Sequence, residues 1–196
     1  LNPDGSGPDD NPLGPGNPTF ALGIRNSFGL CFDPATGQLW ETENGPTEDD
    51  EINLIEPGGN YGWPERLGPG GEPAFVDPVL NFPETIVPTG CAVSEGTLLF
   101  GEGYDGNLHV MPLPGPTEGI VARFDGGITD IAPAPDGSIW VVTPSSLYRR
   151  IAPIDALSPM PGNGEPPSGL VSGAGLVIAA LLIGGLLLMR TRLLRR

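Results

Sequence analysis

The stretch FGLCFDPATGQLWETENG, residues 28–45, places one apolar run, a turn at Thr36-Gly37 and a second apolar run in direct succession. The same pattern returns in TGCAVSEGTLLFGEGYDGNLHVM (89–111) and in ITDIAPAPDGSIWVVTPSSLYRR (128–150). Short apolar runs separated by glycine turns are typical of antiparallel strand pairs. No helical period interrupts them before residue 152, so the sequence predicts an all-β domain.

The spacing of these repeats predicts how the strands are grouped. Repeats about 40 to 60 residues apart are typical of propeller blades with four strands each. About three blades fit into residues 1–151, and three blades cannot close a ring. Because the chain also begins at Leu1 without a signal peptide, we expect it to be the C-terminal portion of a longer protein. A β-sandwich or barrel with regular hairpins is the alternative.

The charge of the chain narrows its partners. All nine basic residues are arginines, and four of them fall within residues 190–196. The remaining part carries 24 acidic residues against five arginines, a net charge of −19. This surface excludes nucleic acid as a partner and favours cations.

The C-terminal tail predicts a membrane anchor. Residues 169–189 contain no charge, and as a helix they would span roughly 32 Å, which matches the hydrocarbon core of a bilayer. The arginine-rich residues 190–196 then predict a cytoplasmic C-terminus and a single-pass protein of the cell membrane. Residues 152–168 are rich in proline and glycine and read as a linker, which holds an extracytoplasmic domain off the membrane.

Two cysteines, Cys31 and Cys91, would then lie in an oxidising compartment. They can form a disulfide or be buried as two small apolar residues, and the sequence favours neither. The single histidine, His109, alternates with Leu108 and Val110, which places it on the opposite face of a strand. We assign it no role.

The segment NGPTEDDEINLIEPGGNYGWP, residues 44–64, holds four consecutive acids and a Gly45-Pro46 turn. Calcium prefers six to eight oxygen ligands, and backbone carbonyls can be among them. The turn carbonyls of Gly45 and Pro46 and the side chain of Glu51 could supply such oxygens. A solvated acidic loop is the alternative, and the spacing does not fit an EF-hand.

Read together, GIRNSFG (23–29), ETENGPTEDDEINLI (41–55) and GGNYGWP (58–64) resemble the glucose/sorbosone dehydrogenase family. The resemblance implies a six-bladed β-propeller that binds pyrroloquinoline quinone (PQQ) and calcium. It also implies a soluble quinoprotein activity, in which a histidine base removes the proton of a sugar's anomeric hydroxyl while hydride passes to PQQ. That histidine belongs to an earlier blade and is absent from this chain.

The resemblance assigns roles to seven residues. Arg25 and Asn26 match a pair that contacts PQQ, and Thr85 matches a threonine near the cofactor. The carbonyls of Gly45 and Pro46 match ligands of the calcium that holds PQQ. Glu51 and Tyr61 match ligands of a second, structural calcium.

Three positions depart from the family pattern. A PQQ-binding lysine is expected near Tyr104, and the chain has no lysine. An arginine pair is expected where Gly127 and Thr129 stand. In the family, the lysine and the arginine pair would neutralise carboxylates of PQQ. Their absence therefore argues against tight PQQ binding or implies another binding mode.

Three functions follow from these observations. The first is a membrane-anchored, PQQ-dependent sugar dehydrogenase with a sugar substrate and a respiratory electron acceptor. The second is a non-catalytic, calcium-stabilised propeller that serves as a binding or receptor module. The third is an acidic domain that sequesters cations at the cell surface.

Overall fold

The computed structural model describes residues 1–150 and 170–172, and every regular element among them is a β-strand. The strands form three antiparallel sheets of four strands each, in which neighbours in sequence are neighbours in space. Sheet one contains β1 (Ser27–Phe32), β2 (Leu39–Glu43), β3 (Asp50–Ile55) and β4 (Leu80–Phe82). Sheet two contains β5 (Pro88–Ser94), β6 (Thr97–Glu102), β7 (Asn107–Pro112) and β8 (Gly119–Arg123). Sheet three contains β9 (Asp130–Pro133), β10 (Ile139–Val142), β11 (Leu147–Arg150) and β12 (Leu170–Ser172).

The predicted repeats coincide with the first hairpin of each sheet. The β1–β2, β5–β6 and β9–β10 pairs all run antiparallel. Their turns contain the glycines that the sequence marks, and Gly37, Gly96 and Gly137 all have positive φ. The all-β prediction is therefore confirmed, and a four-stranded antiparallel meander is the repeating unit that a propeller blade requires.

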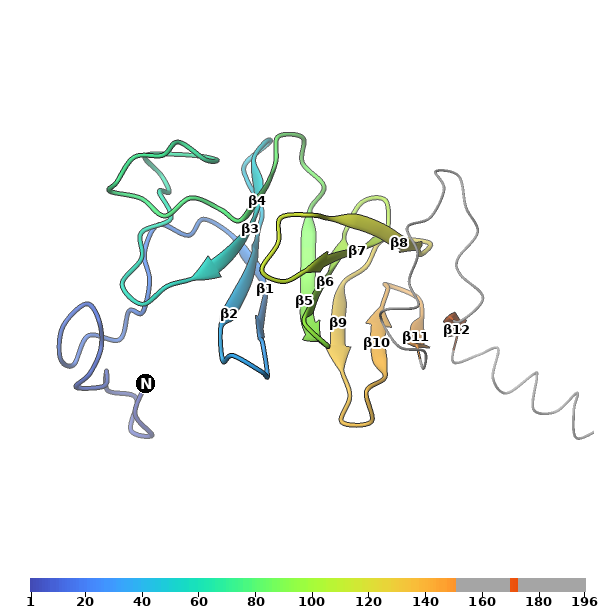
Figure 1. Cartoon of the computed structure of the whole chain (residues 1–196), viewed down its shortest axis with the longest axis horizontal. Coiled ribbons are helices and arrows are strands. Elements are labelled where there is room, and N and C mark those ends of the chain that lie inside the picture. Colours follow the sequence, from blue (N-terminus) through green and yellow to red (C-terminus); the bar gives the residue numbers. More distant parts are fainter. Residues whose placement is uncertain (151–169, 173–196) are drawn as a thin grey trace, which may run out of the picture.

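The three sheets lie side by side, with β1, β5 and β9 as adjacent strands (Figure 1). These strands run in the same direction, since the start of β1 meets the start of β5, and the start of β5 meets the start of β9. A Cβ on Gly29 would lie 2.7 Å from the carbonyl oxygen of Thr89, and Gly90 is in similarly close contact with Asp130. The starts of β1, β5 and β9 and the ends of β2 and β6 thus share one edge, which we name the upper edge.

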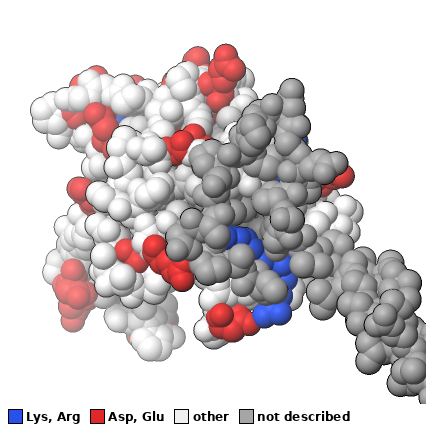
Figure 2. Space-filling model, turned by 45° about the vertical axis from the view of Figure 1, so that its right-hand side comes forward, with Lys and Arg blue, Asp and Glu red and all other residues white. Residues whose placement is uncertain are grey.

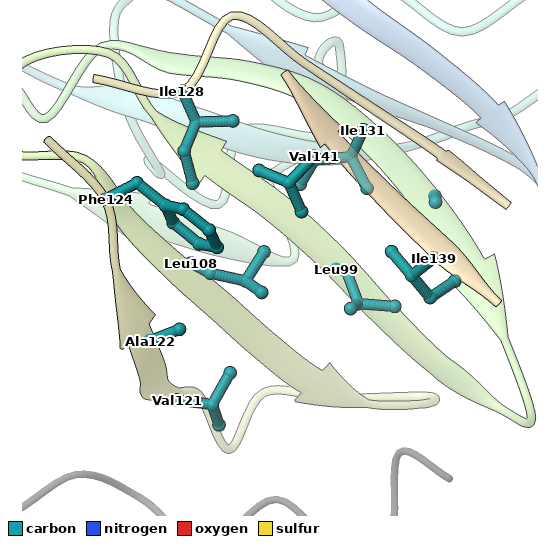
Figure 3. Packing of buried hydrophobic residues seen from close by; sticks show 10 residues of the cluster. Leu99, Leu108, Val121, Ala122, Phe124, Ile128, Ile131, Ile139 and Val141 are labelled. Carbon is teal, nitrogen blue, oxygen red and sulfur yellow. The ribbon is translucent and has the colours of Figure 1, made fainter. Parts of the chain in front are cut away.

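Two apolar clusters hold the sheets together. Figure 3 shows the cluster between sheets two and three, in which Leu99 and Leu108 of sheet two face Ile131, Ile139 and Val141 of sheet three. The second cluster joins sheets one and two and contains Trp40, Ile52, Phe100 and Met111. The side chains come from alternate positions of the strands, as expected for sheets that pack face to face.

Cys31 of β1 and Cys91 of β5 form a disulfide that links sheet one to sheet two. The sequence left this pairing open, because the packing of sheet one against sheet two brings together residues 60 positions apart, and spacing alone does not reveal that packing.

The visible face in Figure 2 carries dispersed acidic residues, and its few basic residues gather in one small area. The predicted linker (152–168), the predicted membrane helix (169–189) and the arginine-rich tail (190–196) lie outside the described residues, except for 170–172. These three residues are not helical in the structure. They form β12, which pairs with β11 and supplies partners for its edge. None of the described residues forms a helix long and apolar enough to cross a membrane.

Candidate functional site at the upper edge

Arg25 stands at the upper edge, just before β1. Its Nη1 donates to the carbonyl oxygens of Asn44 and Gly45 at 2.8 and 3.1 Å, directly after the end of β2. The guanidinium lies over the ring of Trp63, 5.3 Å from the centroid. Within residues 1–150 and 170–172, its Nε and Nη2 groups have no hydrogen-bond partner. The arginine is therefore held from one side and presents a cationic fork on the other.

Asn26 and Asn44 connect the two strands beside Arg25. The carbonyl oxygen of Asn26 accepts from the amide of Asn44 at 3.0 Å, and the Asn26 side chain is exposed. The Asn44 side chain is buried and donates to the carbonyl oxygen of Pro88, at the start of β5. Asn44 thus fixes the position of sheet one relative to sheet two, while Asn26 faces solvent.

The turn at Gly45 and Pro46 admits no side chain at its first position. A Cβ added to Gly45 would overlap the carbonyl oxygen of Glu48. The amide of Gly45 donates to the carboxylate of Asp50 at 2.8 Å, while Pro46 is exposed. The carbonyl of Gly45 accepts one hydrogen bond, from Arg25, and retains a second lone pair.

Asp50 organises this turn, and the sequence did not single it out. One carboxylate oxygen accepts from Gly45, and the other accepts from the Thr85 hydroxyl and the amides of Ile86 and Val87 at 2.7 to 2.8 Å. Asp50 is fully buried. Because strand side chains alternate, Asp50 and Glu51 point to opposite faces of β3, which the acidic run alone could have indicated.

The same carboxylate holds a strained segment in place. Val87 has a φ of 56°, a value that β-branched residues rarely adopt. Its backbone amide donates to Asp50, and its carbonyl oxygen accepts from the backbone amide of Gly103, directly after β6. Arg25, Asn26, Gly45, Pro46 and Thr85 are therefore gathered at the upper edge by a common framework.

Glu51 belongs to a second polar group on the other face of sheet one, which we name the carboxylate cluster: Glu41, Glu43, Glu51 and Asn53. Asn53 Nδ2 donates to a carboxylate oxygen of each glutamate, at distances of 3.1, 3.4 and 3.1 Å. All four residues are buried. The other oxygen of Glu51 accepts from the amide of Gly68.

Burial raises the pKa values of the three glutamates in the carboxylate cluster. Burial and the charge of Glu43 raise the pKa of Glu41 to about 8. Burial, together with repulsion from Glu51, raises the pKa of Glu43 to about 7 against the opposing effect of hydrogen bonds from the backbone. Burial also raises the pKa of Glu51. Simultaneous ionisation of all three glutamates is therefore unfavourable.

Tyr61 is buried, but its hydroxyl forms hydrogen bonds away from Glu51. It donates to the carbonyl oxygen of Leu54 at 2.6 Å and accepts from the amide of Glu56 at 2.8 Å. These partners lie at the opposite end of β3 from Glu51, so the structure does not bring the Tyr61 hydroxyl to the Glu51 carboxylate. In the described part of the chain, no three His, Cys, Asp or Glu side chains form a ready-made metal site.

The family model described as Glucose / Sorbosone dehydrogenase matches residues 1–149. The chain belongs to the glucose/sorbosone dehydrogenase family. The family predicted from GIRN, DDEIN and NYGWP is thus confirmed.

The chain is similar to several known proteins and solved structures. The chain is 30% identical over 171 residues to the uncharacterized protein slr1608 of Synechocystis, covering 73% of this chain and 41% of that protein. It is 54% identical over 70 residues to quinoprotein glucose dehydrogenase B of Acinetobacter calcoaceticus, 35% of this chain and 14% of that one. The PQQ-bound aldose sugar dehydrogenase of Streptomyces coelicolor has a TM-score of 0.68 at 31% identity, covering 88% of this chain and 49% of that structure. The chain thus spans less than half the length of these relatives.

The positions at which this family member departs from the expected pattern also lie at the upper edge. Tyr104 follows β6 and is 70% exposed. Gly127 and Thr129 precede β9, and a Cβ on Gly127 would overlap the carbonyl oxygen of Gly103. Sheets two and three approach so closely at Gly127 that this backbone leaves no room for an arginine side chain there.

His109 lies away from the upper-edge site, within sheet two. Its ring nitrogens contact Glu102 at 3.1 Å and Glu118, and its ring stacks on Phe100 with centroids 4.7 Å apart. Burial alone would lower the pKa of His109, but the hydrogen bonds to the two glutamates outweigh this effect and raise it. These contacts hold the His109 ring inside sheet two.

Proposed function

We propose that this chain is part of a membrane-anchored, extracytoplasmic PQQ-dependent sugar dehydrogenase that oxidises the anomeric hydroxyl of an aldose. The observation that carries this proposal is the arrangement of Arg25. Its guanidinium is clamped to two carbonyls and a tryptophan, yet two of its nitrogen groups are left for an anionic ligand at the upper edge. A planar, multiply carboxylated quinone suits such a fork.

The residues at the upper edge fit PQQ and calcium in part. Arg25 and Asn26 would hold the cofactor through charge and amide hydrogen bonds. The carbonyls of Gly45 and Pro46 would contribute oxygen ligands to a calcium ion, for which Gly45 retains a lone pair. Thr85 donates its hydroxyl to Asp50, so its contribution is to shape the adjacent turn. PQQ, when bound, supplies the hydride-accepting group, and the protein supplies orientation and charge.

Each of these groups has a definable task. Arg25 offsets negative charge at the upper edge, where the described chain provides few other cations. Asp50 holds the Gly45 turn and the 85–87 segment in one geometry, so that carbonyls and guanidinium keep their relative positions. The proton of the sugar needs a base that these residues do not supply, because His109 is enclosed by Glu102 and Glu118.

The disulfide between Cys31 and Cys91 supports the extracytoplasmic placement, since such bonds persist in oxidising compartments. We further propose that three of six propeller blades are present here, and that the chain is anchored by the apolar segment after β12. Seventeen uncharged residues, 173–189, follow Ser172. As a helix they would measure roughly 26 Å, at the short end of the range for a bilayer span. Anchoring would keep the enzyme near a respiratory electron acceptor.

The test is a titration of the full chain, in detergent and with calcium, with PQQ. We expect the PQQ absorbance spectrum to change upon binding. In Arg25→Gln the affinity for PQQ should be about tenfold lower or more, because a charge-assisted contact is lost. Arg149→Gln is the matched control, since Arg149 also lies over a tryptophan, Trp140, at 5.6 Å. An affinity that is equal in both variants would contradict the role of Arg25. Dye reduction with aldoses, in a chain extended to the length of its relatives, then tests the activity.

A second candidate function is a non-catalytic, calcium-stabilised binding module of the same family. The close approach of Gly127 to Gly103 and the absence of a lysine near Tyr104 favour it, because both remove expected cofactor contacts. The double variant Tyr104→Lys/Thr129→Arg places cations at two exposed positions of the upper edge. If wild type ignores PQQ and this variant binds it, the module function is supported over the enzyme.

A further inference from the structure

Trp63, whose ring lies against the guanidinium of Arg25, is held in place by the pairing of its backbone. Residues 20–23 and 58–63 run side by side in the same direction and are joined by four backbone hydrogen bonds of 2.8 to 2.9 Å. The last of these bonds runs from the amide of Trp63 to the carbonyl oxygen of Gly23, two residues before Arg25. A Cβ on Gly23 would lie only 2.5 Å from a backbone nitrogen of the partner segment. The two segments are therefore in direct contact where Trp63 meets Arg25.

The chain that follows Trp63 is anchored by Arg66. The amide of Arg66 donates to the carbonyl oxygen of Gly62 at 2.9 Å, which closes a turn around Trp63. The Arg66 side chain is only 9% exposed, and its Nη1 lies 2.7 Å from a carboxylate oxygen of Asp77. Its Nη2 donates to the carbonyl oxygen of Val76 at 2.9 Å. Trp63 is thus fixed by backbone pairing before it and by a buried arginine after it.

This fixed indole limits how Arg25 can meet a ligand. Nη1 is occupied by the carbonyl oxygens of Asn44 and Gly45, and the ring centroid of Trp63 lies 5.3 Å from Cζ. Hydrogen bonds from one nitrogen hold that corner of the guanidinium, whereas the ring opposes tilting of its plane. Among residues 1–150 and 170–172, no group accepts from Nε or Nη2. These two nitrogens form one edge with two parallel N–H groups, which matches the two oxygens of a planar carboxylate.

We propose that Trp63 is a positioning residue, which directs the Nε–Nη2 edge of Arg25 at a carboxylate of the ligand. The inference rests on the proposed function for the identity of that ligand, PQQ, but the orientation of Arg25 is a property of the chain alone. The chain has no lysine, and Gly127 and Thr129 stand where an arginine pair is expected. Arg25 therefore provides a larger share of the positive charge, and its orientation has a correspondingly larger effect on affinity.

The first experiment needs no PQQ. Phenylglyoxal closes a ring across two guanidinium nitrogens, so it should react slowly with an arginine that has one nitrogen occupied and one face against an indole. The full chain in detergent is treated with this reagent, and modification of Arg25 is followed by mass spectrometry of its peptide. Trp63→Leu should raise the rate of modification severalfold, and Trp63→Phe, which keeps a ring, should restore a rate near that of wild type.

Trp140→Leu is the matched control, because it removes the ring beside Arg149 and should leave the rate at Arg25 unchanged. Urea unfolding checks that each variant is folded. Trp63 is 37% exposed, so its truncation removes little buried volume, and Trp63→Met takes the place of Trp63→Leu if the latter does not fold. An unchanged rate at Arg25 after loss of the Trp63 ring overturns the proposal.

The second experiment is a double-mutant cycle in a titration with PQQ. Trp63→Leu alone should lower PQQ affinity about two- to fivefold, as expected for the loss of an exposed cation–ring contact. In the Arg25→Gln background it should cause no further loss, because Trp63 acts through Arg25. An equal loss in both backgrounds would mean that Trp63 acts independently of Arg25, which overturns the proposal. If wild type does not bind PQQ, the proposed function fails, and the labelling of Arg25 still decides the role of Trp63.

Discussion

Replacing Asp50 by asparagine tests the framework of the upper edge directly. The Asp50 carboxylate accepts four hydrogen bonds, one from Gly45 and three from the 85–87 segment. All four partners of Asp50 are donors. Asparagine keeps one acceptor oxygen, but its NH2 group would face a donor in place of the other oxygen. If the retained oxygen faces Thr85, Ile86 and Val87, the amide of Gly45 loses its partner.

The magnitude follows from these bonds. One buried donor without a partner costs about 1–3 kcal/mol, and three bonds that lose charge assistance weaken by about 0.5–1 kcal/mol each. Together they predict a loss of about 2.5–6 kcal/mol for Asp50→Asn, a large part of the stability of a typical domain. The loss should be concentrated in the turns that flank Gly45 and Val87.

The assay is urea unfolding of the full chain followed by tryptophan fluorescence, with hydrogen exchange of the peptides that contain residues 44–50 and 85–88. Asp77→Asn is the matched control. Asp77 also accepts hydrogen bonds from two backbone amides, of Gly70 and Gly71, and from Arg66, but it lies at the surface. If Asp50→Asn unfolds at the same urea concentration as wild type or Asp77→Asn, the proposed framework is wrong.

Three further perturbations follow from the structure. Reduction of the Cys31–Cys91 disulfide, which closes a separation of 60 residues, should lower stability by up to about 4 kcal/mol in the chain-entropy account, measured by urea unfolding with and without reductant. Since the pKa of His109 is raised in the folded state, its contribution should be complete below about pH 6.5 and lost as the pH rises through the folded pKa. The raised pKa values of Glu41 and Glu43 act in the same direction, so in His109→Gln the dependence of the melting temperature on pH should become shallower but persist, and an unchanged dependence would contradict the contribution of His109. Gly127→Ala should destabilise more than Gly137→Ala, because both glycines have positive φ but only Gly127 faces a carbonyl oxygen of the neighbouring sheet; equal losses in urea unfolding would refute the close approach.

The strand pairs were predictable because their signal is local. The turns at Gly37, Gly96 and Gly137 and the apolar runs beside them lie within about 20 residues of one another, so the sequence displays each hairpin as a unit. The fourth strand of sheet three was not predictable in this way. Leu170–Ser172 reads as part of an apolar helix, and its pairing with β11 depends on contacts across a long connection.

The site was predictable only where the resemblance supplied it. Arg25 and Gly45 were marked by motif, but nothing local shows that Asp50 bridges Gly45 to residues 35 to 37 positions further along the chain. Likewise, the pairing of Glu41 with Asn53 requires the register of β2 and β3. Contacts between strands are set by packing of the whole sheet, and a single sequence does not encode them in short windows.

The exposed side of β1 affects the tendency of the chain to self-associate in solution. Phe28, Leu30 and Phe32 alternate along this edge strand and are 57, 63 and 65% exposed, while Cys31 between them is turned toward β5. An apolar stripe beside an unpaired strand edge invites contact with like surfaces. Purified alone, this polypeptide should self-associate increasingly with concentration despite its high negative charge. A charged residue in place of Leu30 would therefore make a better-behaved sample without touching the upper edge.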